Sequence, residues 1–237
     1  MISTDDAPAV RASSPQLGQP QPPSRVESRS VGFAPDFVPY EHGLALQAEA
    51  AARLEGGSQL GTILLLEHLP VYTAGRRSDP DEYPSDGTPV VPVDRGGRVT
   101  WHGPGQLVAY PIVRLRPQVG VVDLVRALEE TIIDVMAEFG LSGRRVEGRS
   151  GVWADAADGQ LAKVAQIGLH AKAGVITHGL AINCSNDPAP FLNFVPCGIR
   201  DAGVTTLSEI AGRTITPAQV AEPLQSRLEA TLEGVIA

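Results

Sequence analysis

Hydrophobic residues recur along the chain at spacings that predict alternating helices and strands. Over residues 39–54 they return every three to four positions, and two glycines at 56–57 follow, which predicts an amphipathic helix with its C-terminal stop. The same pattern over 121–139, ended by Gly140, predicts the longest helix. Residues 61–68 are apolar on both alternating sides, which is typical of a central strand.

Shorter apolar runs predict further strands, several of them joined by tight turns. One of these strands is expected to end at Thr73 and Ala74, and the others are expected at 90–93, 107–115, around Arg145, and at 151–154, 161–170 and 174–182. Two later segments, Thr206–Glu209 and Thr216–Gln219, have the form of capping boxes. They predict a short helix and a C-terminal helix, the latter kinked at Pro223.

Strands of this kind, mixed with three or four helices, predict an α/β fold of the α+β type: a mixed, largely antiparallel sheet packed with helices. Residues 1–30 hold five prolines, several serines and glutamines and few large apolar side chains. Such a segment cannot bury enough surface to offset its chain entropy, which predicts a disordered tail. We expect residues 31–237 to form a single catalytic domain.

The stretch with the richest chemistry runs over residues 93–112 and reads VDRGGRVTWHGPGQLVAYPI. It holds four glycines and a proline between two strands, so its backbone N–H groups are able to approach a ligand closely. A plain connection between strands does not need the polar and aromatic side chains that lie in the same loop. We therefore interpret it as a binding loop, whose candidate residues are Arg95, Thr100, Trp101, His102 and Gln106.

The composition of the chain argues against several classes of function. The formal net charge of -8 argues against a general nucleic-acid binder, which normally carries a basic face. Two cysteines do not make a secreted disulfide scaffold. The apolar runs are too short to span a bilayer, and no signal peptide is visible at the N-terminus, so we expect a cytoplasmic protein without membrane contact.

The familiar signatures of metal and nucleotide sites are missing from the sequence. Neither CxxC nor HxxxH spacing occurs, which makes zinc unfavoured. There is no GxxxxGK[ST] loop and no GxSxG elbow, so neither a phosphate-binding loop nor a serine hydrolase is indicated. We expect no metal and no cofactor.

Two residues stand out as candidates for catalysis. Of 19 basic residues only Lys163 and Lys172 are lysine, and Lys163 begins a predicted strand that is otherwise apolar or small. A solvated edge position is the commoner fate of such a lysine, whereas an inward one is a competent acid or base. Cys197 lies between Pro196 and Gly198, in a turn that presents its sulfur, while Cys184 is interpreted as structural.

Five motifs together resemble the lipoyl(octanoyl) transferases, over roughly residues 39–211. They are RGGRVTWHGPGQLVAYPI, GVW, KVAQIGL, THGLAIN and FVPCGIRDAGVTTL. The resemblance implies a fold similar to the catalytic domain of biotin and lipoate protein ligases, with Cys197 as nucleophile and Lys163 as its partner. It also implies a substrate pocket formed by Arg95, Gly96, Gly97, Arg98, Val99, Thr100, Trp101, His102, Gln166, Ile167, Gly168, Gly179, Leu180 and Ala181.

The activity that the resemblance implies is transfer of an octanoyl or lipoyl group, the first step of endogenous protein lipoylation. The donor would be octanoyl-acyl carrier protein, and the acceptors would be lipoyl domains of 2-oxoacid dehydrogenase E2 subunits and the glycine cleavage H protein. Because these partners are typically acidic, a basic docking patch is expected, with Arg76, Arg77, Arg144, Arg145 and Arg149 as candidates.

Two alternatives remain at this point. One is an ATP-dependent lipoate or biotin protein ligase of the same fold, which would transfer the free acid. The other is a non-catalytic acyl-binding or carrier-binding protein, for which Cys197→Ser would leave all function intact.

Overall fold

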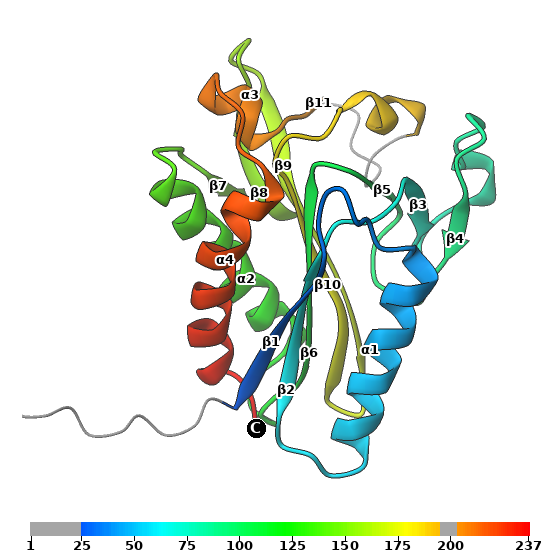
Figure 1. Ribbon diagram of the computed structural model, residues 1–237, viewed down its shortest axis with the longest axis vertical. Helices are drawn as coiled ribbons and strands as arrows, with labels where there is room; N and C mark the ends of the chain where they lie inside the picture. The colour runs from blue at the N-terminus through cyan, green and yellow to red at the C-terminus, as the bar shows by residue number, and fades with distance from the viewer. Residues whose placement is uncertain (1–24, 195–202) are drawn as a thin grey trace, which may run out of the picture.

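An eight-stranded sheet runs through the protein, with helices against both of its faces (Figure 1). The computed structural model describes residues 25–194 and 203–237. Helices α2 and α4 pack on one face, and α1 packs on the other. The elements in chain order are β1 (Val26–Gly32), α1 (Tyr40–Glu55), β2 (Gly61–Leu66), β3 (Val71–Ala74), η1 (Pro80–Glu82), β4 (Val90–Pro92), β5 (Val99–His102), β6 (Gln106–Arg114), α2 (Val121–Glu138), β7 (Arg144–Val146), β8 (Arg149–Asp155), β9 (Leu161–Lys172), β10 (Val175–Asn183), η2 (Ala189–Asn193), β11 (Gly203–Val204), α3 (Leu207–Ala211) and α4 (Pro217–Glu233).

The predicted sheet type is confirmed. The strand order is β1-β2-β6-β10-β9-β8-β7, with β11 paired to β9. Within this sheet β1 pairs with β2, and β11 with β9, in parallel, and the other pairings are antiparallel. A smaller sheet, β4-β3-β5, lies beside the upper part of the large one, near the upper end of α1 (Figure 1). The glycine-rich loop joins β4 to β5 and then β5 to β6, so it lies between the two sheets.

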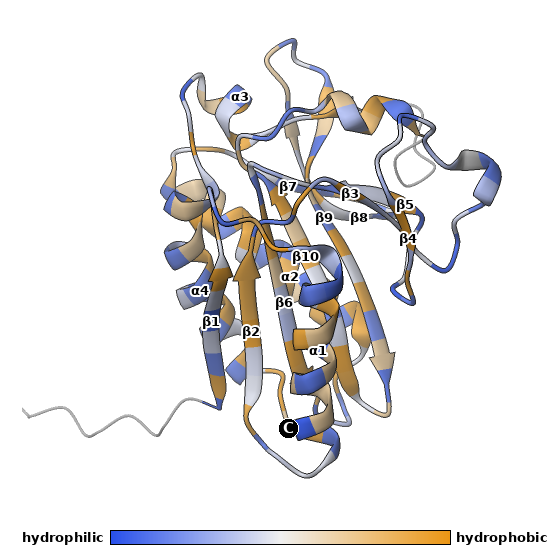
Figure 2. Ribbon diagram, turned by 45° about the vertical axis from the view of Figure 1, so that its right-hand side comes forward, coloured by the Kyte–Doolittle hydropathy of each residue, from blue (hydrophilic) through white to orange (hydrophobic). Residues whose placement is uncertain are grey.

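Strand β2 shows how the apolar pattern produces the layers. Successive side chains of a strand point to opposite faces. Ile63 and Leu65 pack into the core beneath α2 and α4, whereas Leu64 and Leu66 pack into the core beneath α1. All four are at most 2% exposed, so the prediction of a central strand is confirmed. Figure 2 shows the same apolar character along the central strands of the sheet.

One predicted boundary, the end of the disordered N-terminal tail, is wrong. Residues 1–30 were expected to form a disordered tail, but residues 26–30 belong to β1, which pairs in parallel with β2. This strand carries few apolar residues; its backbone pairs with the buried β2, and Val26 at its start is buried. Residues 1–24 lie outside the described residues.

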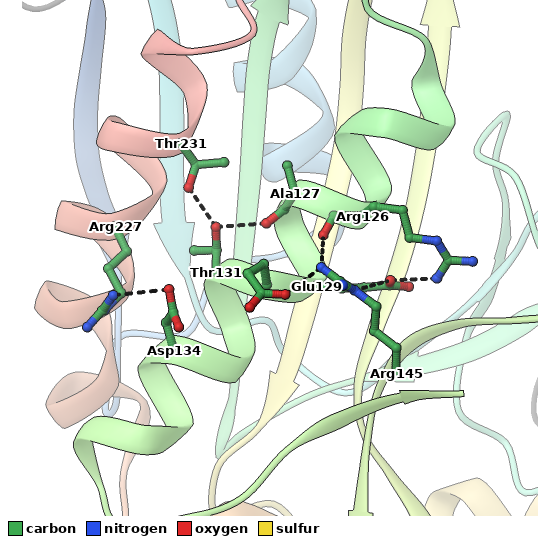
Figure 3. Close-up of polar contacts among 9 residues, drawn as sticks. Arg126, Ala127, Glu129, Thr131, Asp134, Arg145, Arg227 and Thr231 are labelled. Atoms are coloured by element: carbon green, nitrogen blue, oxygen red, sulfur yellow. Dashed lines mark hydrogen bonds and ion pairs between the residues drawn. The ribbon is translucent and has the colours of Figure 1, made fainter. Parts of the chain in front are cut away.

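A buried carboxylate joins α2 to the sheet. Glu129 is fully buried, and its Oε1 accepts a hydrogen bond from the backbone N–H of Gly151 in β8 at 2.9 Å. Its Oε2 lies 2.6 Å from Arg126 Nη1 and 3.3 Å from Arg145 Nε (Figure 3). A buried charge requires such partners, because leaving it unpaired is costly. Glu129 therefore fixes the position of Gly151 relative to α2.

A second set of polar contacts joins α2 to α4. The hydroxyls of Thr131 and Thr231 lie 2.7 Å apart, and Arg227 pairs with Asp134 at 3.2 Å (Figure 3). These contacts flank the apolar seam between the two helices.

Replacing Glu129 tests this connection. Glu129→Ala removes the acceptor of Gly151 and leaves two arginines without their buried partner, so we expect the free energy of unfolding to fall by about 3 kcal/mol. Denaturant unfolding measures it. Glu130→Ala is the matched control, since the Glu130 side chain is 56% exposed and pairs with Arg145 at the surface; there we expect a change below about 1 kcal/mol. Equal losses in the two variants would contradict the assignment.

Candidate active site

A cavity of about 230 Å³ lies between the large sheet and the glycine-rich loop. Its walls come from β5, from the middle of β9 and β10, and from the turn before β8. Twelve of the fourteen residues predicted to bind substrate line it; the two others are Val99 and Trp101. The twelve are Arg95, Gly96, Gly97, Arg98, Thr100, His102, Gln166, Ile167, Gly168, Gly179, Leu180 and Ala181.

Val99 and Trp101 lie on the opposite side of β5. Because side chains alternate along a strand, Thr100 and His102 face the cavity while Val99 and Trp101 face away. Trp101 packs edge-on against Phe191, with ring centroids 5.8 Å apart, in a separate apolar cluster. These two residues hold the small sheet against η2, outside the cavity lining.

Arg95 organises the loop from within. It is buried, and its Nη1 donates to the carbonyls of Gly96 and Arg98 at 3.0 and 2.9 Å. Its Nη2 donates to the carbonyl and the hydroxyl of Thr73 at 2.7 Å each. The guanidinium therefore ties the loop to β3, so that the glycines keep their place at the cavity wall.

A one-residue bulge in β9 brings two predicted site residues to the same wall. Trp153 of β8 pairs with Lys163, but the preceding Val152 pairs with Ala165, so β9 carries one extra residue here. Such a bulge changes which face the following side chains meet. As a result Lys163 and Gln166, although three positions apart, both line the cavity, while Val164 and Ala165 between them pack into the core.

Gly151 makes this bulge possible. Its φ is +93°, and a Cβ at this position would lie 2.3 Å from the carbonyl oxygen of Ala165. Any other residue would push β8 away from β9 at the point where Lys163 is held. The side chain of Lys163 is buried, with 4% of the residue exposed. The inward alternative for Lys163, rather than the solvated edge position, is therefore confirmed.

Two buried histidines lie at or behind the part of the cavity wall formed by His102 and Tyr110. His68 Nδ1 donates to the carbonyl of Val38 at 2.8 Å, so its Nε2 accepts from the hydroxyl of Tyr110, also at 2.8 Å. Burial lowers the pKa of His68 to about 4 and that of His102 to about 3, so both rings are neutral near pH 7.

The tautomer of His102 follows from its partner. The Nε2 of Gln106 donates to the carbonyl of Trp101 and to Oδ1 of Asn183, so the Oε1 of Gln106 accepts from His102 Nδ1 at 2.8 Å. The Nε2 of His102 therefore carries the lone pair. Asn183 in turn donates to the carbonyl of Thr205, which connects the cavity to the chain beyond β11.

Several residues that line the cavity were not predicted to do so, and two of them, Arg77 and Arg149, were expected only in a docking patch. Tyr40 begins α1 and reads as an ordinary helix residue, and His178 lies in the THGLAIN motif without an assigned role. His178 has a φ of +58°, is buried, and places its Nε2 2.8 Å from Asp94 Oδ1. A histidine inside an apolar strand was the available signal. The missed lining residues are Tyr40, Arg77, Tyr110, Gly148, Arg149, Ser150 and His178.

The predicted nucleophile, Cys197, lies outside the described residues. The described residues on either side of its segment have different neighbours. Phe194 packs against Tyr72 under the small sheet, and Val204 pairs with Lys163. Cys184 is fully buried, which raises the pKa of its thiol, and this agrees with its structural interpretation.

The described residues hold no group of three or more histidine, cysteine or acidic side chains placed to bind a metal. None of their helices is long and apolar enough to cross a membrane.

The fold and the cavity define the class of the protein. Residues 39–229 match the model of the lipoyl protein ligase A/B catalytic domain. Lipoate-protein ligase A bound with ATP has a similar structure, with a TM-score of 0.64 at 13% identity over 89% of this chain and 85% of that one. The bi-partite lipoate protein ligase of Thermoplasma acidophilum gives a TM-score of 0.65 at 15% identity over 88% of this chain and 84% of that one.

Relatives in sequence identify the family within this class. An octanoyltransferase of Leifsonia xyli is 53% identical over 195 residues, which are 81% of this chain and 87% of the relative. An octanoyltransferase of Mycolicibacterium smegmatis is 49% identical over 211 residues, 88% of this chain and 90% of the relative. The chain belongs to the octanoyltransferase family and is an acyltransferase of protein lipoylation. The predicted family, fold and activity are confirmed.

Because His68 is buried and neutral in the folded protein, we expect the stability of the protein to depend on pH. The unfolded chain binds a proton at a pKa of 6.5, but the folded protein does so only at about 4. Between these values the unfolded state holds more protons, so stability falls as pH falls from 6.5 to 4, by up to about 3 kcal/mol from this group. Denaturant unfolding of the wild type and His68→Gln at pH 7 and pH 4.5 measures it.

We expect the wild type to lose more stability than His68→Gln over this interval. His42→Gln is the control, because His42 is exposed on α1, and it should keep the wild-type slope. If His68→Gln loses as much stability as the wild type between pH 7 and pH 4.5, His68 is not a buried neutral ring.

Proposed function

We propose that this octanoyltransferase moves an octanoyl or lipoyl group from acyl carrier protein to a lysine of a lipoyl domain through a thioester on Cys197. The observation that carries the proposal is the placement of Lys163. It is buried on the cavity wall and pairs through β11 with the chain that follows the segment of Cys197. A lysine in this place is suited to act on a thiol, because its amine accepts a proton and its ammonium stabilises a thiolate.

The proposed reaction has two acyl transfers. The thiolate of Cys197 attacks the carbonyl carbon of the donor thioester, the bond to the carrier sulfur breaks, and the carrier thiol leaves with a proton returned through Lys163. The neutral ε-amine of the acceptor lysine then attacks the enzyme thioester. An amide forms, the thiolate of Cys197 leaves, and the proton lost by the amine returns to the site.

The energetics require no ATP in this scheme. Conversion of a thioester to an amide is downhill, so the donor already carries the activation. An ATP-dependent ligase acting on the free acid is the second candidate, and the likeness to solved lipoate protein ligases concerns the fold alone. Transfer from octanoyl-carrier protein without ATP separates the two.

We propose the lipoyl domains of 2-oxoacid dehydrogenase E2 subunits and the glycine cleavage H protein as acceptors, and the cytoplasm as the place of action. The solved ligase of T. acidophilum is described together with its E2 lipoyl domain, which supports an acceptor of this kind. The substrate pocket is proposed to be the cavity, where Ile167, Leu180 and Ala181 supply apolar surface for the acyl chain.

Intact-protein mass after incubation with octanoyl-carrier protein tests the acyl-enzyme. We expect one octanoyl adduct on the wild type and on Cys184→Ala, and none on Cys197→Ala. Lys163→Met should form the adduct at least about 100-fold more slowly, because general acid–base groups contribute about that much or more. An adduct on Cys197→Ala, or full transfer to a lipoyl domain by Cys197→Ser, would refute the covalent route.

Two of the five arginines predicted to form a basic docking patch have acidic partners. Arg144 pairs with Asp155, and Arg145 pairs with Glu129 and Glu130, so acidic neighbours offset both charges. Arg77 and Arg149 line the cavity, and Arg76 is exposed beside them. We therefore propose that the carrier protein docks at the cavity mouth, against Arg76, Arg77 and Arg149.

Charge reversal distinguishes the two groups of arginines. Arg77→Glu should weaken binding of the acidic carrier protein at low salt by about 5-fold or more, because it places a like charge at the mouth. Arg144→Glu is the matched control and should bind within about 2-fold of the wild type. Titration of labelled carrier protein measures both, and equal affinities of the two variants would remove the docking site.

A further inference from the structure

Lys163 lies against the ring of Trp153. Its Nζ is 4.9 Å from the centroid of the ring, and both residues are buried, with 4% and 1% exposed. The two residues are direct partners in the pairing of β8 with β9. Their contact is therefore built into the strand register of the sheet and does not depend on a loop.

The stem of the same lysine passes over Gly151. Gly151 lies two positions before Trp153 in β8. A Cβ on residue 151 would lie 3.1 Å from Lys163 Cε, which is tighter than ordinary contact. The missing side chain at residue 151 leaves room for the lysine stem, and the ring at residue 153 receives its end.

An aromatic face suits this lysine better than a carboxylate does. A buried ammonium needs compensation for the water that it has lost. Among the described residues, none of those lining the cavity is aspartate or glutamate. The negative face of an indole attracts a cation within about 6 Å of its centroid. It does so without adding a negative charge beside the lysine.

We propose that Trp153 is a positioning residue for acyl transfer: its ring holds the ammonium of Lys163 at the cavity wall. The inference rests on the proposed function, in which that ammonium stabilises a cysteine thiolate. A second cation touches the same ring, since the guanidinium carbon of Arg149 lies 5.5 Å from its centroid. Trp153 therefore also connects the buried lysine to the cavity mouth.

Fluorinated tryptophan tests the contact without removing the ring. Fluorine withdraws electron density from the indole face and weakens its attraction for a cation, while the shape changes little. Tryptophan at position 153 alone is replaced by its mono-, di- and trifluoro analogues. We expect kcat for octanoyl transfer to fall stepwise, by about 10-fold for the trifluoro form, with KM for octanoyl-carrier protein unchanged.

Trp101 provides the matched control, because it is the other tryptophan of the chain and lies outside the cavity lining. The same analogues at position 101 should leave kcat within about 2-fold of the wild type. Trp153→Phe should retain part of the activity that Trp153→Leu loses, since Phe offers a weaker aromatic face. Thermal unfolding of each protein shows whether the fold is kept.

Two outcomes overturn the inference in different ways. If the enzyme transfers octanoyl groups but kcat is the same across the fluorinated series at position 153, Trp153 has no part in holding the charge, and the proposed function stands. If unmodified enzyme forms no octanoyl adduct and transfers nothing, the proposed function fails, and this inference falls with it.

Discussion

The site depends on the one-residue bulge of β9. In a regular strand, residues three positions apart point to opposite faces, so Lys163 and Gln166 would not share a wall. The bulge after Lys163 removes this conflict, and it exists because Gly151 lets β8 approach the carbonyl of Ala165. Glu129 then holds the N–H of Gly151 from the far side of the sheet. A buried charge in the helical layer thus supports the geometry of the cavity on the other face.

Local pattern was sufficient to predict most of the fold, for physical reasons that particular elements show. In β2 every side chain is buried on one face or the other, so its apolar run is unbroken and easily read. Strand β1 has no such signal: its residues are mainly polar, and only its pairing with β2 makes it a strand. That pairing is a long-range contact, which no window of local sequence contains. Residues 26–30 were assigned to the tail for this reason.

Some residues of the candidate site could likewise be predicted from local sequence, and others could not. Its loop was predicted from glycines and polar residues that lie within a dozen positions of one another. Tyr40 comes to the cavity through helix packing, so nothing near it in sequence marks it. Trp153 belongs to the GVW motif, but its contact with Lys163 depends on the pairing of β8 with β9, which no window of local sequence contains. Alternation along β5 separates Thr100 and His102 from their neighbours Val99 and Trp101, a distinction that depends on which face of the strand meets the cavity.

The charge of the cavity is opposite to that of the whole chain. The protein carries a formal charge of -8, yet the described lining holds four arginines and Lys163, with no carboxylate among them. At the other end His68 and His102 stay neutral, because burial lowers the pKa of both. Arg95 and His102 both contact the hydroxyl of Thr73, so positive charge lies beside the neutral histidines as well as around Lys163. In the proposed function, this positive lining gives an acidic carrier protein one place to dock on a chain of net negative charge, so electrostatics selects its orientation. In the proposed function, the positive lining also favours the thiolate of Cys197 over its thiol.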